Sequence, residues 1–169
     1  MLKLVLRKDK SQTAPFQRGL FPNSDPRSFL LVELPLRSGK EFLEIVENAS
    51  PRLIVDLRDV PRFNFDILTR GKAFEAFAKV KSTYVDSDLP IELDGSRKNW
   101  NELFVRHKTL SALKEGRALG PYMFLFSRDN EMPLFEQFLM KELPKSSGKS
   151  WSILRITSEE AFALKKFSK

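Results

Sequence analysis

Short apolar runs alternate along this chain with longer stretches in which apolar residues recur at helical spacing. The runs are bounded by proline, glycine or polar residues and have the length of strands. They cover residues 2–6, 29–34, 53–57, 82–85, 122–126 and 151–156. Strands that alternate with helices of about 10–15 residues are typical of crossover units, which build parallel sheets. The sequence therefore predicts one three-layer α/β domain over residues 1–169, with a mainly parallel sheet and helices on both faces.

Several helix starts are marked by side chains that can satisfy free backbone N–H groups. Residues 38–41 (Ser-Gly-Lys-Glu) and 157–160 (Thr-Ser-Glu-Glu) have the capping-box pattern, so a helix is expected to begin at each. Residues 97–116 are expected to form one helix, and Pro133 is expected to be the first residue of another. Asn64 or Asp66 is expected to cap a further helix, whose apolar stripe consists of Ile67, Leu68, Gly71, Phe74, Phe77 and Ala78.

Positive charge is concentrated at the two ends of the sequence. The net charge is +7, to which residues 1–40 contribute +5, residues 41–140 contribute −2 and residues 141–169 contribute +4. Residues 8–28 include three prolines and lack periodicity, which predicts a long loop. Such basic ends suit a nucleic-acid or acidic protein partner, and the alternative is a surface that serves solubility only. The candidate contact residues are Lys8, Lys10, Arg18, Arg27, Lys145 and Lys149.

The composition excludes several kinds of site. Without cysteine the chain has no disulfide, no thiolate metal site and no cysteine nucleophile, and its single histidine excludes multi-histidine metal sites. Its apolar runs are far shorter than the roughly 20 residues of a membrane helix, and its N-terminal run is too short for a signal peptide. We therefore expect a cytoplasmic protein with no membrane contact and no cofactor.

Dense polar sequence follows three of the expected strands. Ligands of open parallel sheets bind beyond the carboxyl ends of the strands, so these residues are candidates for a site if the three strands are neighbours. Three uses are open: salt bridges that close the rim of the sheet, an anion held by the arginines, or Mg²⁺ held by the aspartates. The candidates are Asp56, Arg58, Asp59, Arg62, Tyr84, Asp86, Ser127, Arg128 and Asp129.

Residues 53–66, preceded by the Glu-Phe-Leu-Glu-Ile helix at 41–45 and followed by Thr-Tyr-Val-Asp at 83–86, resemble an uncharacterised bacterial domain family of unknown function. That family shares an Asp-x-Arg strand end followed by proline, and its fold is rhodanese-like. The resemblance implies matching roles for Asp56, Arg58, Pro61 and Tyr84. Where the family carries a cysteine after its late strand, this chain has Ser127, so thiol chemistry is absent.

Ser127 has no evident base. A serine nucleophile needs a base within hydrogen-bond reach, and the only histidine, His107, falls on the same apolar stripe as Trp100 and Phe104. That position is typical of a packed core residue, and the G-x-S-x-G elbow is absent. Phosphate-binding glycine-rich loops are absent as well.

These observations favour a non-catalytic binding module. It would recognise a protein or nucleic acid through its basic terminal segments and a crevice at the strand ends. The alternative is a Mg²⁺-dependent phosphoryl-transfer or phosphodiester-cleaving enzyme. In that enzyme Asp56 would act with Asp59, Asp86 or Asp129, while Arg58 or Arg128 would hold the phosphate.

Overall fold

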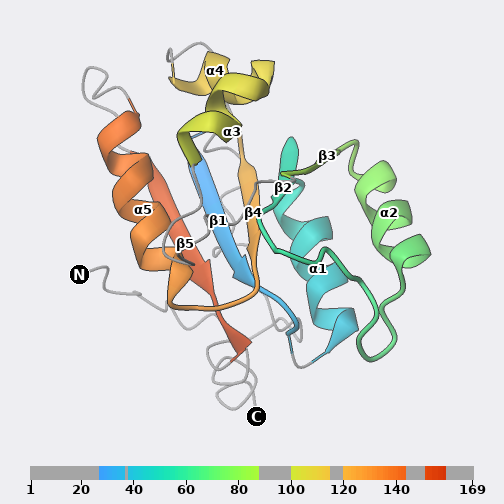
Figure 1. Cartoon of the computed structure of the whole chain (residues 1–169). Coiled ribbons are helices and arrows are strands. Elements are labelled where there is room, and N and C mark those ends of the chain that lie inside the picture. The colour runs from blue at the N-terminus through green and yellow to red at the C-terminus, as the bar shows by residue number, and fades with distance from the viewer. Residues whose placement is uncertain (1–26, 37, 88–99, 115–119, 144–150, 159–169) are drawn as a thin grey trace, which may run out of the picture.

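Five strands form the central sheet: β1 (Ser28–Glu33), β2 (Leu53–Asp56), β3 (Thr83–Asp86), β4 (Tyr122–Phe126) and β5 (Ser152–Ile156). Their order across the sheet is β3-β2-β4-β1-β5, and every pair of neighbours is parallel. The computed structural model describes residues 27–36, 38–87, 100–114, 120–143 and 151–158 (Figure 1). The predicted α/β class with a parallel sheet is confirmed.

The strands at the middle of the sheet are buried on both sides. Every residue of β2 and β4 is buried, whereas β3 and β5 at the edges are largely half-exposed or exposed. A parallel strand covered on both faces must be apolar at consecutive positions, which is why these segments read as continuous apolar runs. The bounds predicted for these five strands agree with the structure to within one residue at each end.

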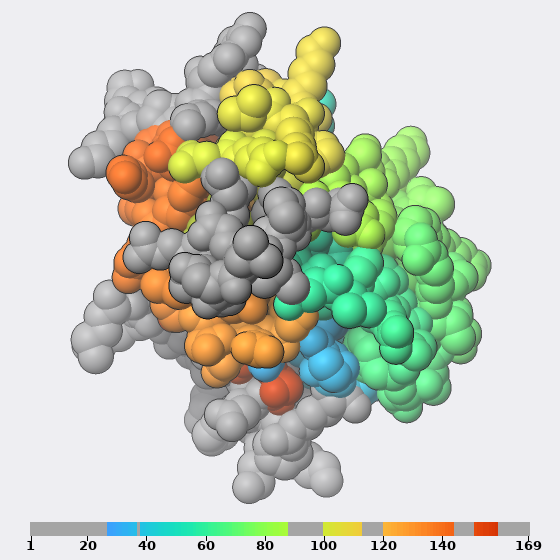
Figure 2. Space-filling model, viewed as in Figure 1, coloured from blue at the N-terminus to red at the C-terminus, as the bar shows by residue number. Residues whose placement is uncertain are grey.

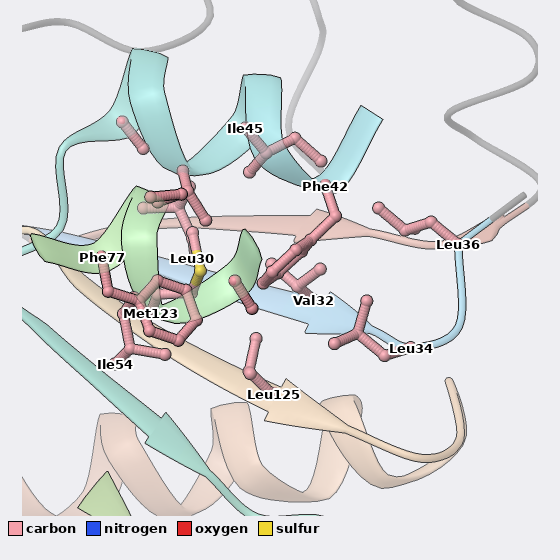
Figure 3. Packing of buried hydrophobic residues seen from close by; sticks show 14 of the residues in the cluster. Leu30, Val32, Leu34, Leu36, Phe42, Ile45, Ile54, Phe77, Met123 and Leu125 are labelled. Atoms are coloured by element: carbon pink, nitrogen blue, oxygen red, sulfur yellow. The ribbon is translucent and has the colours of Figure 1, made fainter. Parts of the chain in front are cut away.

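Helices cover the two faces separately. On one face lie α1 (Gly39–Ala49) and α2 (Arg70–Lys79); on the other lie α3 (Trp100–Arg106), α4 (Lys108–Lys114) and α5 (Glu131–Glu142). Figure 1 shows α1 and α2 together on one side of the sheet and α5 on the other. Successive residues of β1 alternate between the two cores, as strand geometry requires: Leu30 and Val32 face α1, whereas Phe29 and Leu31 face the α5 side. Figure 3 shows the first of these cores, with side chains of β1, β2 and β4 directed at Phe42, Ile45 and Phe77.

The start of α1 is as predicted, but the capping contacts predicted for α1 and α2 are wrong. The side chain of Ser38 precedes α1 but makes no capping hydrogen bond, and it donates to Asp66 instead. Neither Asn64 nor Asp66 caps α2, because that helix begins at Arg70 and its cap is Thr69, whose hydroxyl accepts from the Lys72 N–H.

Two further helix predictions need correction. The helix expected over residues 97–116 is divided into α3 and α4 at His107 within its described part. Pro133 is the third residue of α5, not its first, because the helix begins at Glu131. The strand expected at 2–6, the loop expected at 8–28 up to residue 26, and the helix expected after residue 158 lie outside the described residues. Among the described helices, none combines the length and apolarity needed to cross a membrane.

Gly39, at the start of α1, lies directly against Leu68. A Cβ atom at this position would approach both the Cβ and the backbone nitrogen of Leu68 to 2.6 Å. Because Leu68 is 1% exposed, it has no room to move away. The first turn of α1 and the chain that leads into α2 are therefore in contact because residue 39 has no side chain.

We expect Gly39→Ala to destabilise the fold by roughly 1–3 kcal/mol, since overpacking outweighs the helix preference of alanine. The matched control is Gly71→Ala in α2, where a Cβ would meet only the Thr69 hydroxyl at 3.9 Å. The control should be neutral or stabilising by up to about 1 kcal/mol. Urea denaturation of both variants measures the difference, and equal midpoints would contradict the expectation.

Candidate functional site

The carboxyl ends of β2, β3 and β4 lie side by side, because β2 is the central strand of the three. Asp56 is in register with Asp86 on one side and with Leu125 on the other. Backbone hydrogen bonds continue past the strands, from the Ser87 N–H to the Asp56 carbonyl (3.1 Å) and from the Leu57 N–H to the Leu125 carbonyl (2.9 Å). Polar residues from separate parts of the sequence therefore meet at one edge of the sheet.

Asp56 and Arg58 form a buried ion pair at this edge. The Arg58 Nε atom donates to Asp56 Oδ1 at 2.8 Å and its Nη2 atom donates to Oδ2 at 2.6 Å, the two-pronged geometry typical of strong guanidinium–carboxylate pairs. Asp56 is 0% exposed and Arg58 is 7% exposed. Burying two charges costs several kcal/mol of desolvation, so their geometry and further hydrogen bonds must compensate for it.

Those further hydrogen bonds are present. The backbone N–H of Arg58 donates to Asp56 Oδ1 (3.2 Å), and the Tyr84 hydroxyl donates to Asp56 Oδ2 (2.9 Å). The remaining Arg58 nitrogen, Nη1, donates to the Arg62 carbonyl at 2.8 Å. Burial, followed by the negative charge of Asp56, raises the pKa of Tyr84, so this hydroxyl stays protonated and acts as a donor.

These contacts occupy the carboxylate completely. Each oxygen of Asp56 accepts two hydrogen bonds, which uses the lone pairs that a metal ion or a migrating proton would need. Within the described ranges, no group of three or more acidic or histidine side chains is arranged to hold a metal ion. Of the three uses that the sequence left open, the geometry favours salt bridges that close the rim of the sheet.

The ion pair attaches a long connection to the edge of the sheet. This connection, residues 57–69, joins β2 to α2 and is called here the 57–69 loop. Its inward-facing side chains are buried: Leu57, Arg58, Phe63 and Leu68. The ring of Phe63 lies 4.7 Å below the Arg58 guanidinium and contacts four other aromatic rings, those of Phe42, Phe74, Phe77 and Tyr84. The loop is thus attached to the core along its length.

The outward-facing residues of the same loop are exposed. They include two apolar side chains, Val60 at 56% exposure and Ile67 at 46%. The polar members are Asp59, Arg62, Asn64, Asp66 and Thr69. A connection of this length without its own helix or strand is uncommon in a compact domain and is usually functional.

Asp66 fastens the far end of the loop to α1. Its Oδ2 atom accepts from the Gly39 N–H (3.0 Å) and from the Ser38 hydroxyl (3.2 Å), and its backbone has the left-handed φ of 48° that aspartate and asparagine tolerate. Backbone hydrogen bonds from Ile67 and Gly39 are the largest causes that lower the pKa of Asp66. The ionised carboxylate is therefore the form that the fold stabilises.

This lowered pKa predicts an acid-sensitive contribution to stability. A carboxylate whose folded pKa is depressed stabilises the fold above its unfolded pKa and loses that contribution as the pH falls through the folded value. The free energy of unfolding of the wild type should therefore fall more steeply between about pH 5 and about pH 2 than that of Asp66→Asn, which keeps an acceptor without a charge. Parallel slopes in urea denaturation across this range would contradict the prediction.

The residues expected after β4 do not join the ion pair. Arg128 and Asp129 are exposed, and Ser127 is half-buried. The N–H groups of Glu131 and Met132 at the start of α5 donate to the Arg128 and Asp129 carbonyls, so they are not open to an anion. No hydrogen bond links Ser127 to His107 in the part of the chain that the structure describes.

Of the remaining candidates, Asp59, Arg62 and Asp86 are exposed, and Asp59 and Asp86 each have an interaction partner. Arg27 is half-buried and also has a partner. Lys8, Lys10, Arg18, Lys145 and Lys149 lie outside the described residues. The described residues include 15 Lys or Arg against 14 Asp or Glu, so they account for only +1 of the net charge of +7.

Comparison with known protein families, with curated proteins and with solved structures found no match. The resemblance to a rhodanese-like family therefore stays a prediction from residues 53–66 and their flanks.

Proposed function

We propose that this protein is a non-catalytic binding module that recognises a protein partner through the outer face of the 57–69 loop. One observation carries the proposal: the loop is anchored from beneath by a buried ion pair and an aromatic cluster, while its outer side chains are exposed. A loop already held in one conformation has less entropy to lose on binding, which raises affinity.

The chemistry of the strand ends supports binding over catalysis. A general base or a metal ligand must offer an oxygen to its substrate or ion. The buried carboxylate at the centre of the edge, Asp56, offers none, because Arg58 and Tyr84 occupy both of its oxygens. The arrangement serves to position the chain that follows β2.

The exposed side chains of the loop support a protein partner over nucleic acid. Protein surfaces that bind nucleic acid are strongly basic, whereas the described residues of this chain are nearly neutral. Val60 and Ile67 add exposed apolar area, which protein interfaces use at their centres. Nucleic acid would instead bind the basic terminal segments, and the test below includes that outcome.

Site-specific photo-crosslinking tests the proposal. With a photoreactive amino acid at residue 60 of the full chain, irradiation of the cells that encode the protein should give one discrete protein adduct. The control places the same group at Gln137, an exposed residue of α5 on the opposite face of the sheet. Residue 137 should give no such adduct, because it lies outside the proposed interface.

Two results would overturn the proposal. One is an identical adduct pattern from residues 60 and 137, which indicates unspecific labelling. The other is the absence of an adduct at residue 60. If the full chain then binds mixed-sequence RNA or DNA tightly, with an affinity that falls steeply as salt rises from about 50 mM, the partner is nucleic acid and the interface is the basic segments.

A further inference from the structure

We infer that the partner segment bound by the 57–69 loop is acidic and carries an apolar side chain among its carboxylates. This inference rests on the proposed function and adds the chemistry of the segment that is recognised. Its residues are Arg62 and Arg70 for the carboxylates, and Val60 and Ile67 for the apolar side chain.

The two guanidiniums are exposed cations that form no ion pair with any described part of the chain. No described residue pairs with the side chain of Arg62, although its neighbour Arg58 is fully engaged by Asp56. Arg70 lies over the ring of Phe74, with its central carbon 5.1 Å from the ring centroid, and makes no salt bridge with the described residues. Stacking on a ring orients a guanidinium without neutralising it.

The carboxylates nearby offset these cations only in part. Between residues 59 and 72 two acids, Asp59 and Asp66, stand against three cations, Arg62, Arg70 and Lys72, which leaves a net charge of +1. Lys72, whose Nζ atom donates to the Ile67 carbonyl (3.1 Å), adds a further positive charge beside the loop. The local surplus is therefore positive, even though the described residues as a whole are close to neutral.

The first turn of α2 contradicts the usual preference of helices. Acidic side chains stabilise a helix N-terminus and basic ones oppose its dipole, yet this turn contains Arg70 and Lys72 and no acid. An acidic partner would remove this unfavourable arrangement, and the same cations would speed its association. This feature adds to the charge complementarity of the loop and does not carry the inference alone.

The apolar contribution comes from the same stretch of chain. Val60 and Ile67 belong to the loop whose last residue, Thr69, caps α2. Figure 2 shows the loop and α2 as one continuous surface, coloured teal to green, on the face turned to the viewer. A segment that covers this surface would bury both aliphatic side chains beside the two guanidiniums.

Selection from a phage-displayed library of random 12-residue peptides on the immobilised full chain tests the inference. The enriched peptides should contain several Asp or Glu around at least one large apolar residue. A synthetic copy of an enriched peptide should bind Arg62→Glu and Arg70→Glu at least about 10-fold more weakly than the wild type, because charge reversal replaces attraction with repulsion. The control, Lys141→Glu on α5, should change affinity by less than about two-fold. All three variants should unfold at the wild-type temperature.

Enrichment of neutral or basic peptides, no enrichment at all, or affinities unchanged in both arginine variants would overturn the inference. Failure here is distinguishable from failure of the proposed function. If the adduct at residue 60 forms in cells and persists in Arg62→Glu and Arg70→Glu, a protein still binds the loop but the acidic chemistry is wrong. If that adduct is absent, the proposed function itself fails.

Discussion

Arg58→Met should lower the free energy of unfolding by about 3–5 kcal/mol, the cost typical of leaving one partner of a buried ion pair uncompensated. Methionine keeps an unbranched apolar stem, but it is shorter than arginine and has neither its charge nor its donors. Asp56, which is 0% exposed in the wild type, would then keep only the backbone N–H of residue 58 and the Tyr84 hydroxyl as donors. The Arg62 carbonyl would lose the hydrogen bond from Arg58 as well.

Urea denaturation measures this loss of stability, and two further variants serve as controls. Arg62→Met removes an exposed arginine from the same loop and should change stability by no more than about 0.5 kcal/mol. The double variant Asp56→Asn/Arg58→Met should lose less than the sum of the two single variants, because residues in one hydrogen-bonded pair are coupled. A loss below about 1 kcal/mol in Arg58→Met would be the value of a surface pair and would contradict the structural role.

The sequence predicted the strands well because their signal is local. A strand buried on both faces must be apolar at consecutive positions, and the runs at 53–57 and 122–126 meet that requirement on their own. The candidate site required β2, β3 and β4 to be neighbours, but the sequence could not predict this, since strand order depends on crossovers that no local pattern encodes. In the structure the three strands are neighbours.

Helix starts were predicted less well because a distant residue takes part in them. Asp66 reads as a cap for the helix that follows it, yet its carboxylate binds the N–H of Gly39, which lies 27 positions earlier. The contact of Gly39 with Leu68 brings those segments together and is invisible in the sequence. The capping-box pattern at 38–41 was therefore correct about where α1 begins and wrong about what the Ser38 side chain does.

The residues of the candidate site were predicted, but the hydrogen bonds between them were not. Asp56, Arg58 and Tyr84 were all selected as residues at strand ends, and they do meet. Whether such residues face an open crevice or each other depends on side-chain direction, which the spacing Asp-x-Arg does not define. No role was predicted for Phe63, although two aromatic residues in one connection, Phe63 and Phe65, were a signal for an anchor.

Phe63→Ala tests that anchor, and it should destabilise the protein by about 3–5 kcal/mol, as is typical for loss of a buried aromatic side chain. Phe63 is 3% exposed and its ring contacts those of Phe42, Phe74, Phe77 and Tyr84. Removal of the ring leaves a cavity beneath the loop and takes away the surface on which the Arg58 guanidinium lies. Asn64→Ala, at the exposed neighbouring position, is the control and should be within about 0.5 kcal/mol of the wild type.

Phe63→Ala also distinguishes two roles of the ring: it either positions the 57–69 loop or only stabilises the core beneath it. Hydrogen exchange should accelerate most at the amides of Arg62 and Leu68, which donate to the Val60 and Phe65 carbonyls within the loop. The Leu57 amide, bonded to β4, should follow the global stability instead. If the loop is the binding element, the adduct at residue 60 should weaken in Phe63→Ala at temperatures where the sheet is still folded. Uniform acceleration across loop and sheet, with the adduct retained, would mean that Phe63 stabilises the core without positioning the loop.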